Sequence, residues 1–293
     1  MRTVDAAALP MADAIGALES ALRAGLDPEA DPPRSIVDAG AGQVLFMPSS
    51  SASYTGVKLV TVAPRNAALN LPRVQGVYVL FDATTLTPLA LLDGAALTSL
   101  RTPAVSALAV RHLSTVDSSR LLVFGTGPQA WGHVEAVRTV RPIGHVDVVG
   151  RRAGPVDGFV ARCRSSGLSA SPAAPSDVAH ADIVCCCTTA RVPVFDSALL
   201  PDHATVVAMG SHEPDAREVD VDLVRRATTV VESRSSALRE AGDIIRAGLV
   251  PVATIDELVR GEVDVPPDRP RLFKSTGMAW EDLVVAAAAY QRG

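Results

Sequence analysis

The sequence has few aromatic residues and no long apolar run. Phe, Trp and Tyr make up 4% of its 293 residues, whereas hydrophobic residues reach 48% and charged residues 20%. No segment approaches the roughly 18 apolar residues that a membrane span needs. The N-terminus also lacks a basic start followed by an apolar run, so no signal peptide is expected. The composition predicts a compact globular protein, which we expect in the cytoplasm.

A strong charge of one sign is also absent. The formal net charge is −5, and no block of like charges occurs along the chain, so nucleic acid and membrane surfaces are not expected partners. The six histidines show no spacing typical of metal ligands. His112 and His133 fall on helical patterns and are interpreted as surface or core residues.

The chain has four cysteines, Cys163 and the run Cys185-Cys186-Cys187. Adjacent residues on a strand point to opposite faces, so three in a row make a poor chelate. The run lies in an apolar stretch that resembles a buried strand. A packing role is therefore favoured over metal or redox chemistry.

The pattern of apolar residues changes near residue 120. Before it, short extended runs separated by turn residues predict an antiparallel or mixed sheet; they span residues 43–47, 56–63, 75–81 and 89–92. A helix follows, and Thr102-Pro103 resembles its N-cap and first position. After residue 120, apolar strands alternate with helical segments, which predicts a parallel sheet with crossover helices; the strands span residues 121–124, 146–149, 183–187, 206–209 and 229–231. The fold class is therefore α/β.

The first of these later strands runs into Gly125-Thr126-Gly127-Pro128-Gln129-Ala130. A strand followed by G-x-G-x-x-A and a helix is the arrangement that binds dinucleotides. Gly125 permits the tight turn, and Gly127 allows the backbone to approach a pyrophosphate at the helix N-terminus. A bare glycine turn is the alternative, but the surrounding strand and helix favour a Rossmann domain.

The second strand of a Rossmann domain indicates which dinucleotide is preferred. NAD-binding domains usually end it with an acidic residue that binds the ribose 2′-hydroxyl. Here the strand is followed by Gly150-Arg151-Arg152. Because two guanidinium groups suit a 2′-phosphate, Arg151 and Arg152 predict NADPH, with NADH less favoured. A solvated surface pair is the alternative.

These features resemble the ornithine cyclodeaminase/mu-crystallin family over nearly the whole chain. The shared motifs are Met47-Pro48, Lys58, Asp93-Gly94, Leu97-Thr98, Arg101-Thr102, the glycine turn, Ala181-Asp182-Ile183-Val184, Gly210 with Pro214 and Arg217-Glu218, Gly242-Asp243, and Phe273-Lys274-Ser275 with Gly277-Met278. The resemblance implies a substrate-binding and dimerisation domain of residues 1–115 and 272–293. It also implies a Rossmann domain of residues 116–271 and a homodimer built through the sheets of the first domain.

The resemblance also implies site residues. Arg34, Lys58 and Arg101 match cations that bind the substrate's carboxylate. Lys58 lies within an apolar run and would be costly to bury unpaired, so a substrate carboxylate is its natural partner. Residues matching positions that line the cofactor are Thr102, Gly125, Gly127, Pro128, Gln129, Thr188, Met209 and Ser275.

Two residues depart from the cyclodeaminase pattern. An aspartate that handles the substrate's amines is replaced by His212, and a glutamate that helps hold the ornithine side chain is replaced by Leu45. Both departures favour reduction of a small cyclic ketimine carboxylate, with Lys58, His212 or water as the proton donor. A cyclodeaminase-type lyase, an amino-acid dehydrogenase and a non-catalytic NADP-binding protein remain alternatives.

Overall fold

The computed structural model of the protein describes residues 1–248 and 253–293. The chain divides into two compact units. The first consists of Met1–Ala104 with Met278–Gly293, and the second is Val105–Gly277. Within the described ranges, no helix is long and apolar enough to cross a membrane.

The first unit is built on a six-stranded sheet of order β1-β6-β5-β4-β3-β2, antiparallel apart from the parallel pair β1–β6. Its strands are β1 (Arg2–Thr3), β2 (Ser35–Asp38), β3 (Gln43–Ser50), β4 (Tyr54–Val62), β5 (Val74–Asp82) and β6 (Pro88–Asp93). The four longer strands, β3 to β6, confirm the predicted extended runs. Two helices, α1 (Met11–Arg23) and α9 (Ala279–Arg292), complete this unit, with the first part of α2 (Gly94–Leu113).

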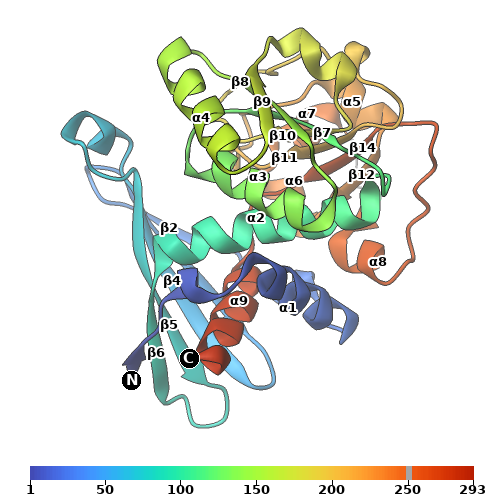
Figure 1. Cartoon of the computed structure of the whole chain (residues 1–293). Helices are drawn as coiled ribbons and strands as arrows, with labels where there is room; N and C mark the ends of the chain where they lie inside the picture. Colours follow the sequence, from blue (N-terminus) through green and yellow to red (C-terminus); the bar gives the residue numbers. More distant parts are fainter. Residues whose placement is uncertain (249–252) are drawn as a thin grey trace. The chain divides into compact units, whose positions relative to one another are not determined.

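One face of this sheet is covered by α9, which packs on β3, β4 and β5 and against α1 (Figure 1). The strands alternate accordingly, because successive side chains point to opposite faces. On β4, Gly56, Lys58 and Val60 are buried, whereas Val57 and Leu59 are only partly so. The inner face therefore carries a lysine among apolar neighbours, which is the feature that the candidate site is built on.

The helix predicted to start at Thr102 starts earlier, so that prediction is wrong. α2 begins at Gly94, and Pro103 lies inside it. The Asp93 carboxylate accepts hydrogen bonds from the N–H groups of Ala95 and Ala96 at 2.8 and 2.9 Å, which caps the helix at this point. A proline inside a helix removes one backbone hydrogen bond. The cap at Asp93 and the burial of α2 offset that loss.

The second unit contains an eight-stranded parallel sheet of order β13-β12-β14-β11-β10-β7-β8-β9. Its strands are β7 (Arg120–Phe124), β8 (His145–Val149), β9 (Ser169–Pro172), β10 (Ile183–Cys186), β11 (Thr205–Ala208), β12 (Thr228–Val231), β13 (Ala253–Thr254) and β14 (Arg271–Lys274). The helices of this unit are α3 (Pro128–Val140), α4 (Ala153–Ser165), α5 (Val221–Arg226), α6 (Arg234–Glu240), α7 (Gly242–Ala247) and α8 (Ile255–Val259). All five predicted strands are confirmed.

The structure adds β9, β13 and β14, which the sequence patterns did not predict. β14 lies between β11 and β12, so residues 272–277 belong to the second unit rather than to the first. The order β9-β8-β7-β10-β11 reverses direction at β7, as in dinucleotide-binding α/β domains. The second unit is therefore a Rossmann-type domain.

Candidate functional site

The glycine turn lies where the strand order reverses, between the carboxyl ends of β7 and β10. Gly125 has a φ of +110°, and a Cβ at this residue would approach the Cys187 carbonyl oxygen to 2.4 Å. Its N–H donates to the Val149 carbonyl at 2.9 Å, which ties the turn to β8. Only glycine satisfies both the conformation and the close approach.

Gly127 is the N-cap residue of α3, and no side chain caps this helix. A Cβ at Gly127 would meet no atom within 4 Å. Pro128 occupies the first turn, where its missing N–H costs nothing. The start of this 13-residue helix thus has unused N–H groups beside open space. This geometry fits a dinucleotide pyrophosphate.

His133 and Gln129 show how the first turn of α3 is fixed. His133 is buried, with Nδ1 2.8 Å from the Gln129 carbonyl oxygen and Nε2 2.9 Å from the Ser106 hydroxyl. A carbonyl only accepts, so Nδ1 carries the proton. Burial lowers the pKa of His133 to about 4. This histidine is a core residue, as the sequence analysis expected.

Arg151 and Arg152 follow β8 and are both exposed, with Arg152 as the N-cap residue of α4. Among the described residues, neither guanidinium forms an ion pair. The acidic residue on β8, Asp147, is buried and bound to Arg120 and His145, so it is not available to a ribose. The strand therefore ends in two exposed cations.

Thr188, Met209 and Ser275 follow β10, β11 and β14, so they lie at the same sheet edge as the glycine turn. Two buried glutamates that were not predicted as site residues accept hydrogen bonds along this edge. Glu218 accepts hydrogen bonds from the Thr188 N–H and hydroxyl at 2.9 and 2.6 Å and from the Gly210 N–H at 2.6 Å. Burial raises the pKa of Glu218 to about 7, opposed mainly by the positive charge of Lys274.

Glu232 is the second of these glutamates. It accepts the Ser275 hydroxyl at 2.6 Å and the Gly277 N–H at 2.9 Å. Lys274, which is 1% exposed, is 3.0 Å from the Asp243 carboxylate and donates to the Ser211 carbonyl at 2.7 Å. The predicted His212 is exposed in the loop that follows.

Lys58 and Arg101 lie in the first unit and share one carboxylate. The Lys58 Nζ is 2.6 Å from the Asp282 Oδ2, and the Arg101 Nε is 3.2 Å from its Oδ1. The Arg101 Nη1 also lies 2.6 Å from the Glu281 Oε2. All four side chains are at most 6% exposed. The protein itself therefore supplies acidic partners for these cations, from α9.

Lys58 keeps donor capacity beyond this ion pair. An ammonium has three N–H groups, and the described residues accept two of them, at Asp282 and at the Thr98 hydroxyl, 3.3 Å away. Burial lowers the pKa of Lys58 to about 8, with repulsion from Arg101 and Arg34 acting in the same direction and attraction to Asp282 opposing it. Arg34, partly exposed before β2, is thus close enough to act on Lys58 electrostatically.

Asp31, a partly buried acid, fixes the start of α9 by accepting the Trp280 N–H at 2.6 Å. Burial raises the pKa of Asp31 to about 6, opposed by a hydrogen bond from Ser49. Tyr78, the register partner of Lys58 on β5, is fully buried, and its hydroxyl has no hydrogen-bond partner among the described residues. A Cβ at Gly56 would overlap this hydroxyl, so the glycine makes room for it.

The predicted residues therefore fall into two groups. Arg34, Lys58 and Arg101 belong to the first unit, as does Thr102, which is buried on α2. The other predicted cofactor residues and His212 gather at the carboxyl edge of the second unit's sheet. The acids Glu281 and Asp282 were not predicted as site residues. A signal was available, since a buried lysine needs an acidic partner and these two acids stand in the first turn of an otherwise apolar helix.

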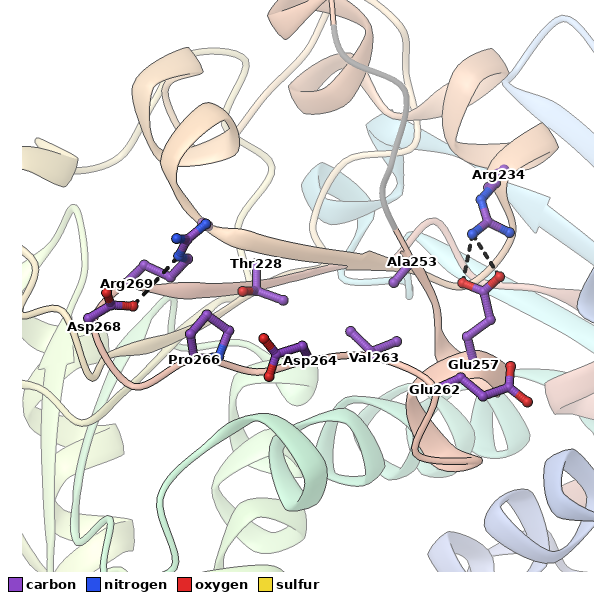
Figure 2. Close-up of a pocket in the computed structure, with 11 residues that line it drawn as sticks. Thr228, Arg234, Ala253, Glu257, Glu262, Val263, Asp264, Pro266, Asp268 and Arg269 are labelled. Carbon is purple, nitrogen blue, oxygen red and sulfur yellow. Dashed lines mark hydrogen bonds and ion pairs between the residues drawn. The ribbon is translucent and has the colours of Figure 1, made fainter.

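A pocket in the second unit lies apart from the glycine turn, beside β12, β13 and α8 (Figure 2). Its side chains are mainly charged, and Arg234 forms a bidentate ion pair with Glu257 at 2.8 and 2.6 Å. None of the predicted site residues lines it. No group of histidine, cysteine and acidic residues suited to a metal occurs in the described ranges. Cys163, Cys185 and Cys186 are buried, in agreement with packing roles.

The fold and the glycine turn define a protein with a dinucleotide-binding Rossmann domain joined to a smaller sheet domain. Comparison with known proteins identifies the group more narrowly. Residues 3–293 match the ornithine cyclodeaminase/mu-crystallin family. A Δ1-pyrroline-2-carboxylate reductase of Burkholderia ambifaria is 36% identical over 253 residues, 85% of this chain and 80% of the relative. An alanine dehydrogenase of Archaeoglobus fulgidus is 31% identical over 293 residues, 97% of this chain and 91% of the relative.

A solved structure is similar over the whole chain. The Δ1-pyrroline-2-carboxylate reductase of Thermococcus litoralis, in complex with NADH and L-proline, superposes with a TM-score of 0.92 at 30% identity, covering 100% of this chain and 97% of that one. The chain belongs to the ornithine cyclodeaminase/mu-crystallin family.

Proposed function

We propose that this chain, an oxidoreductase acting on a C=N bond, uses NADPH to reduce a small cyclic ketimine carboxylate to the cyclic amino acid. Δ1-Pyrroline-2-carboxylate and Δ1-piperideine-2-carboxylate are the proposed substrates. The observation that carries the proposal is the buried cationic site of the first unit. Leu45 lies on the same sheet face as Lys58, one cross-strand row away, and is 3% exposed. An apolar wall beside a cation suits a ring with a carboxylate.

The proposed carboxylate site consists of Arg34, Lys58 and Arg101. A carboxylate only accepts hydrogen bonds, so it needs donors that the protein has not used. Lys58 has one N–H to spare, and the buried Tyr78 hydroxyl is a further donor without an acceptor among the described residues. These donors make the inner face of the sheet complementary to a small anion.

The proposed dinucleotide site lies in the second unit. When bound, a reduced nicotinamide dinucleotide supplies hydride to the carbon of a C=N bond. Gly125, Gly127, Pro128 and Gln129 would hold its pyrophosphate at the start of α3; further lining residues are proposed to be Thr102, Thr188, Met209 and Ser275. The preference for NADPH rests on the two exposed cations after β8, Arg151 and Arg152, and on the engagement of Asp147 elsewhere.

Reduction also requires a proton at the imine nitrogen. Lys58 is the first candidate, because it has an unused N–H and its pKa of about 8 leaves it protonated at neutral pH. His212 or a water molecule are the other candidates. Neither Leu45 nor a neutral His212 would hold the ammonium group of ornithine, so a cyclodeaminase reaction is disfavoured.

The test is an assay of purified protein with NADPH and each cyclic ketimine. We expect stoichiometric oxidation of NADPH and no appreciable release of ammonia from L-ornithine. Ammonia release from ornithine without consumption of the cofactor would replace the proposal by a lyase. Reduction of pyruvate with ammonia, but not of the cyclic imines, would indicate an amino-acid dehydrogenase. Binding of NADPH without turnover of any of these would indicate a non-catalytic protein.

We also propose that the chain forms a homodimer through the outer face of the first unit's sheet. Phe46, Leu59 and Val77 are cross-strand neighbours there, and Phe46 and Val77 are 38% and 39% exposed. A row of apolar side chains on an uncovered sheet face favours contact with another protein surface.

A further inference from the structure

Lys58 lies among several charged side chains on the elements that pack against it. Arg101 reaches it from α2 and Arg34 from the segment before β2, and both lower its pKa. Tyr78 on β5 is uncharged because burial raises the pKa of its phenol well above the ordinary value. Asp282 on α9 is the carboxylate in direct contact with Lys58. Asp31 and Glu281 are further acids of this cluster, but the direct ion pair of Lys58 is with Asp282.

The geometry of Asp282 suits this role. Its two oxygens contact different cations, with Oδ2 at 2.6 Å from Lys58 and Oδ1 at 3.2 Å from Arg101. It lies in the first turn of a 14-residue helix, where the helix dipole favours a carboxylate. The side chain is fully buried, so water does not weaken either contact.

The adjacent Glu281 differs in one respect. It contacts Arg101 at 2.6 Å and has the same complete burial, but the direct ion pair of Lys58 is with Asp282. The two neighbouring acids therefore differ in the cations that they contact. Glu281 contacts the arginine, whereas Asp282 contacts both the arginine and the lysine.

We propose that Asp282 is a positioning residue that keeps Lys58 as an ammonium ion and directs both Lys58 and Arg101 toward the carboxylate and imine nitrogen of the substrate. This inference rests on the proposed function. The Lys58 N–H that neither Asp282 nor Thr98 accepts is the donor that remains for the substrate. Removing the negative charge of Asp282 would leave two adjacent buried cations, and Lys58 is the one that releases its proton.

The decisive variants are Asp282→Asn, which removes the charge, and Asp282→Glu, which keeps it. Glu281→Gln is the matched control, because it removes one charge from the adjacent buried position. The chain contains two lysines, Lys58 and Lys274. Full-length protein labelled with carbon-13 at the lysine Cε therefore gives two side-chain signals, and loss of one in Lys58→Met assigns them.

In the wild type, we expect Lys58 to titrate near pH 8 and kcat/KM for the cyclic ketimine to fall as pH rises through the same value, because the ammonium ion is the active form. In Asp282→Asn, both midpoints should move down by about one pH unit or more. Glu281→Gln and Asp282→Glu should keep the alkaline limb within about half a pH unit of the wild type, although Asp282→Glu is expected to be slower.

A folded Asp282→Asn protein whose Lys58 titrates as in the wild type would overturn the inference. If Asp282→Asn does not fold, the test depends on Asp282→Glu. This variant keeps the negative charge beside Lys58 and should therefore keep the alkaline limb. In that case, a Lys58 midpoint in Asp282→Glu that lies about one pH unit or more below the wild-type value would overturn it. If wild-type protein reduces no cyclic ketimine, the proposed function fails, whereas the lysine titration still tests Asp282 by itself.

Discussion

Arg151 and Arg152 are the residues on which the choice of cofactor depends. We expect Arg151→Ala to raise the KM for NADPH about tenfold, because one charged hydrogen bond to the 2′-phosphate is worth about 1.5 kcal/mol. The KM for NADH should barely change, since NADH has no phosphate there. Steady-state kinetics with both cofactors provide the measurement.

Arg138→Ala is the control for this experiment. Arg138 is a partly exposed arginine in the last turn of α3, away from the strand ends, so its loss should affect neither cofactor. Equal losses with NADPH and NADH in Arg151→Ala would rule out contact with a 2′-phosphate.

At the residue level, the sequence identified the cationic side chains of the candidate site but not the acidic residues that pair with them. Lys58 stood out because a lysine inside an apolar run must be accounted for, whereas Glu281 and Asp282 resembled an ordinary acidic start of a helix. Their role depends on α9 packing across β4, a contact between residues more than 200 positions apart. No local pattern contains that information.

At the level of elements, the two glycines of the turn are expected to have different roles, Gly125 in the fold and Gly127 in binding the cofactor. Gly125→Ala should lower stability by about 1–3 kcal/mol, since it combines a positive φ with a Cβ 2.4 Å from the Cys187 carbonyl oxygen. Gly127→Ala should leave the fold unchanged, because its Cβ meets no atom within 4 Å. It should nevertheless weaken NADPH binding, since that space is proposed for the pyrophosphate.

Thermal unfolding followed by circular dichroism, together with NADPH binding by fluorescence, distinguishes these two glycines. Gly158→Ala on α4 is the control, because its Cβ also meets no atom within 4 Å and it lies in the middle of that helix, away from the proposed cofactor residues. Undiminished NADPH affinity in Gly127→Ala would show that the pyrophosphate does not use this space.

The elements that the sequence predicted share a strong local signal. The long strands β3, β4 and β5 alternate or are apolar, and the first Rossmann strands lie between clear helical segments. β9, β13 and β14 are short, and β14 acquires its place only by inserting between β11 and β12. The start of α2 was misplaced because proline at position 103 resembles a helix start more strongly than Asp93 does.

At the level of the whole molecule, the outer face of the first unit's sheet is the proposed dimer interface. Phe46→Asp should convert the expected dimer to a monomer, because a charge would be buried there without a partner. Sedimentation velocity at micromolar concentration measures this directly. Val116→Asp places the same charge on an apolar side chain that is 81% exposed in the second unit and should leave the assembly intact.

The wild type sedimenting as a monomer, or Phe46→Asp sedimenting as a dimer, would show that this face is not the interface. The first unit requires chain from both ends of the sequence, Met1–Ala104 and Met278–Gly293. Truncation of the C-terminal helix would therefore remove Asp282 together with one layer of that unit.

Lys58 and Lys274 are the only lysines among the 27 basic residues of the chain, and they are 2% and 1% exposed. Both are held by buried aspartates. Reagents that acylate amines therefore have no lysine side chain to modify on the native surface. The other 25 basic residues are arginines, which these reagents do not modify. Acylation of these two residues requires the protein to open, so the extent of labelling over time records how often each unit unfolds.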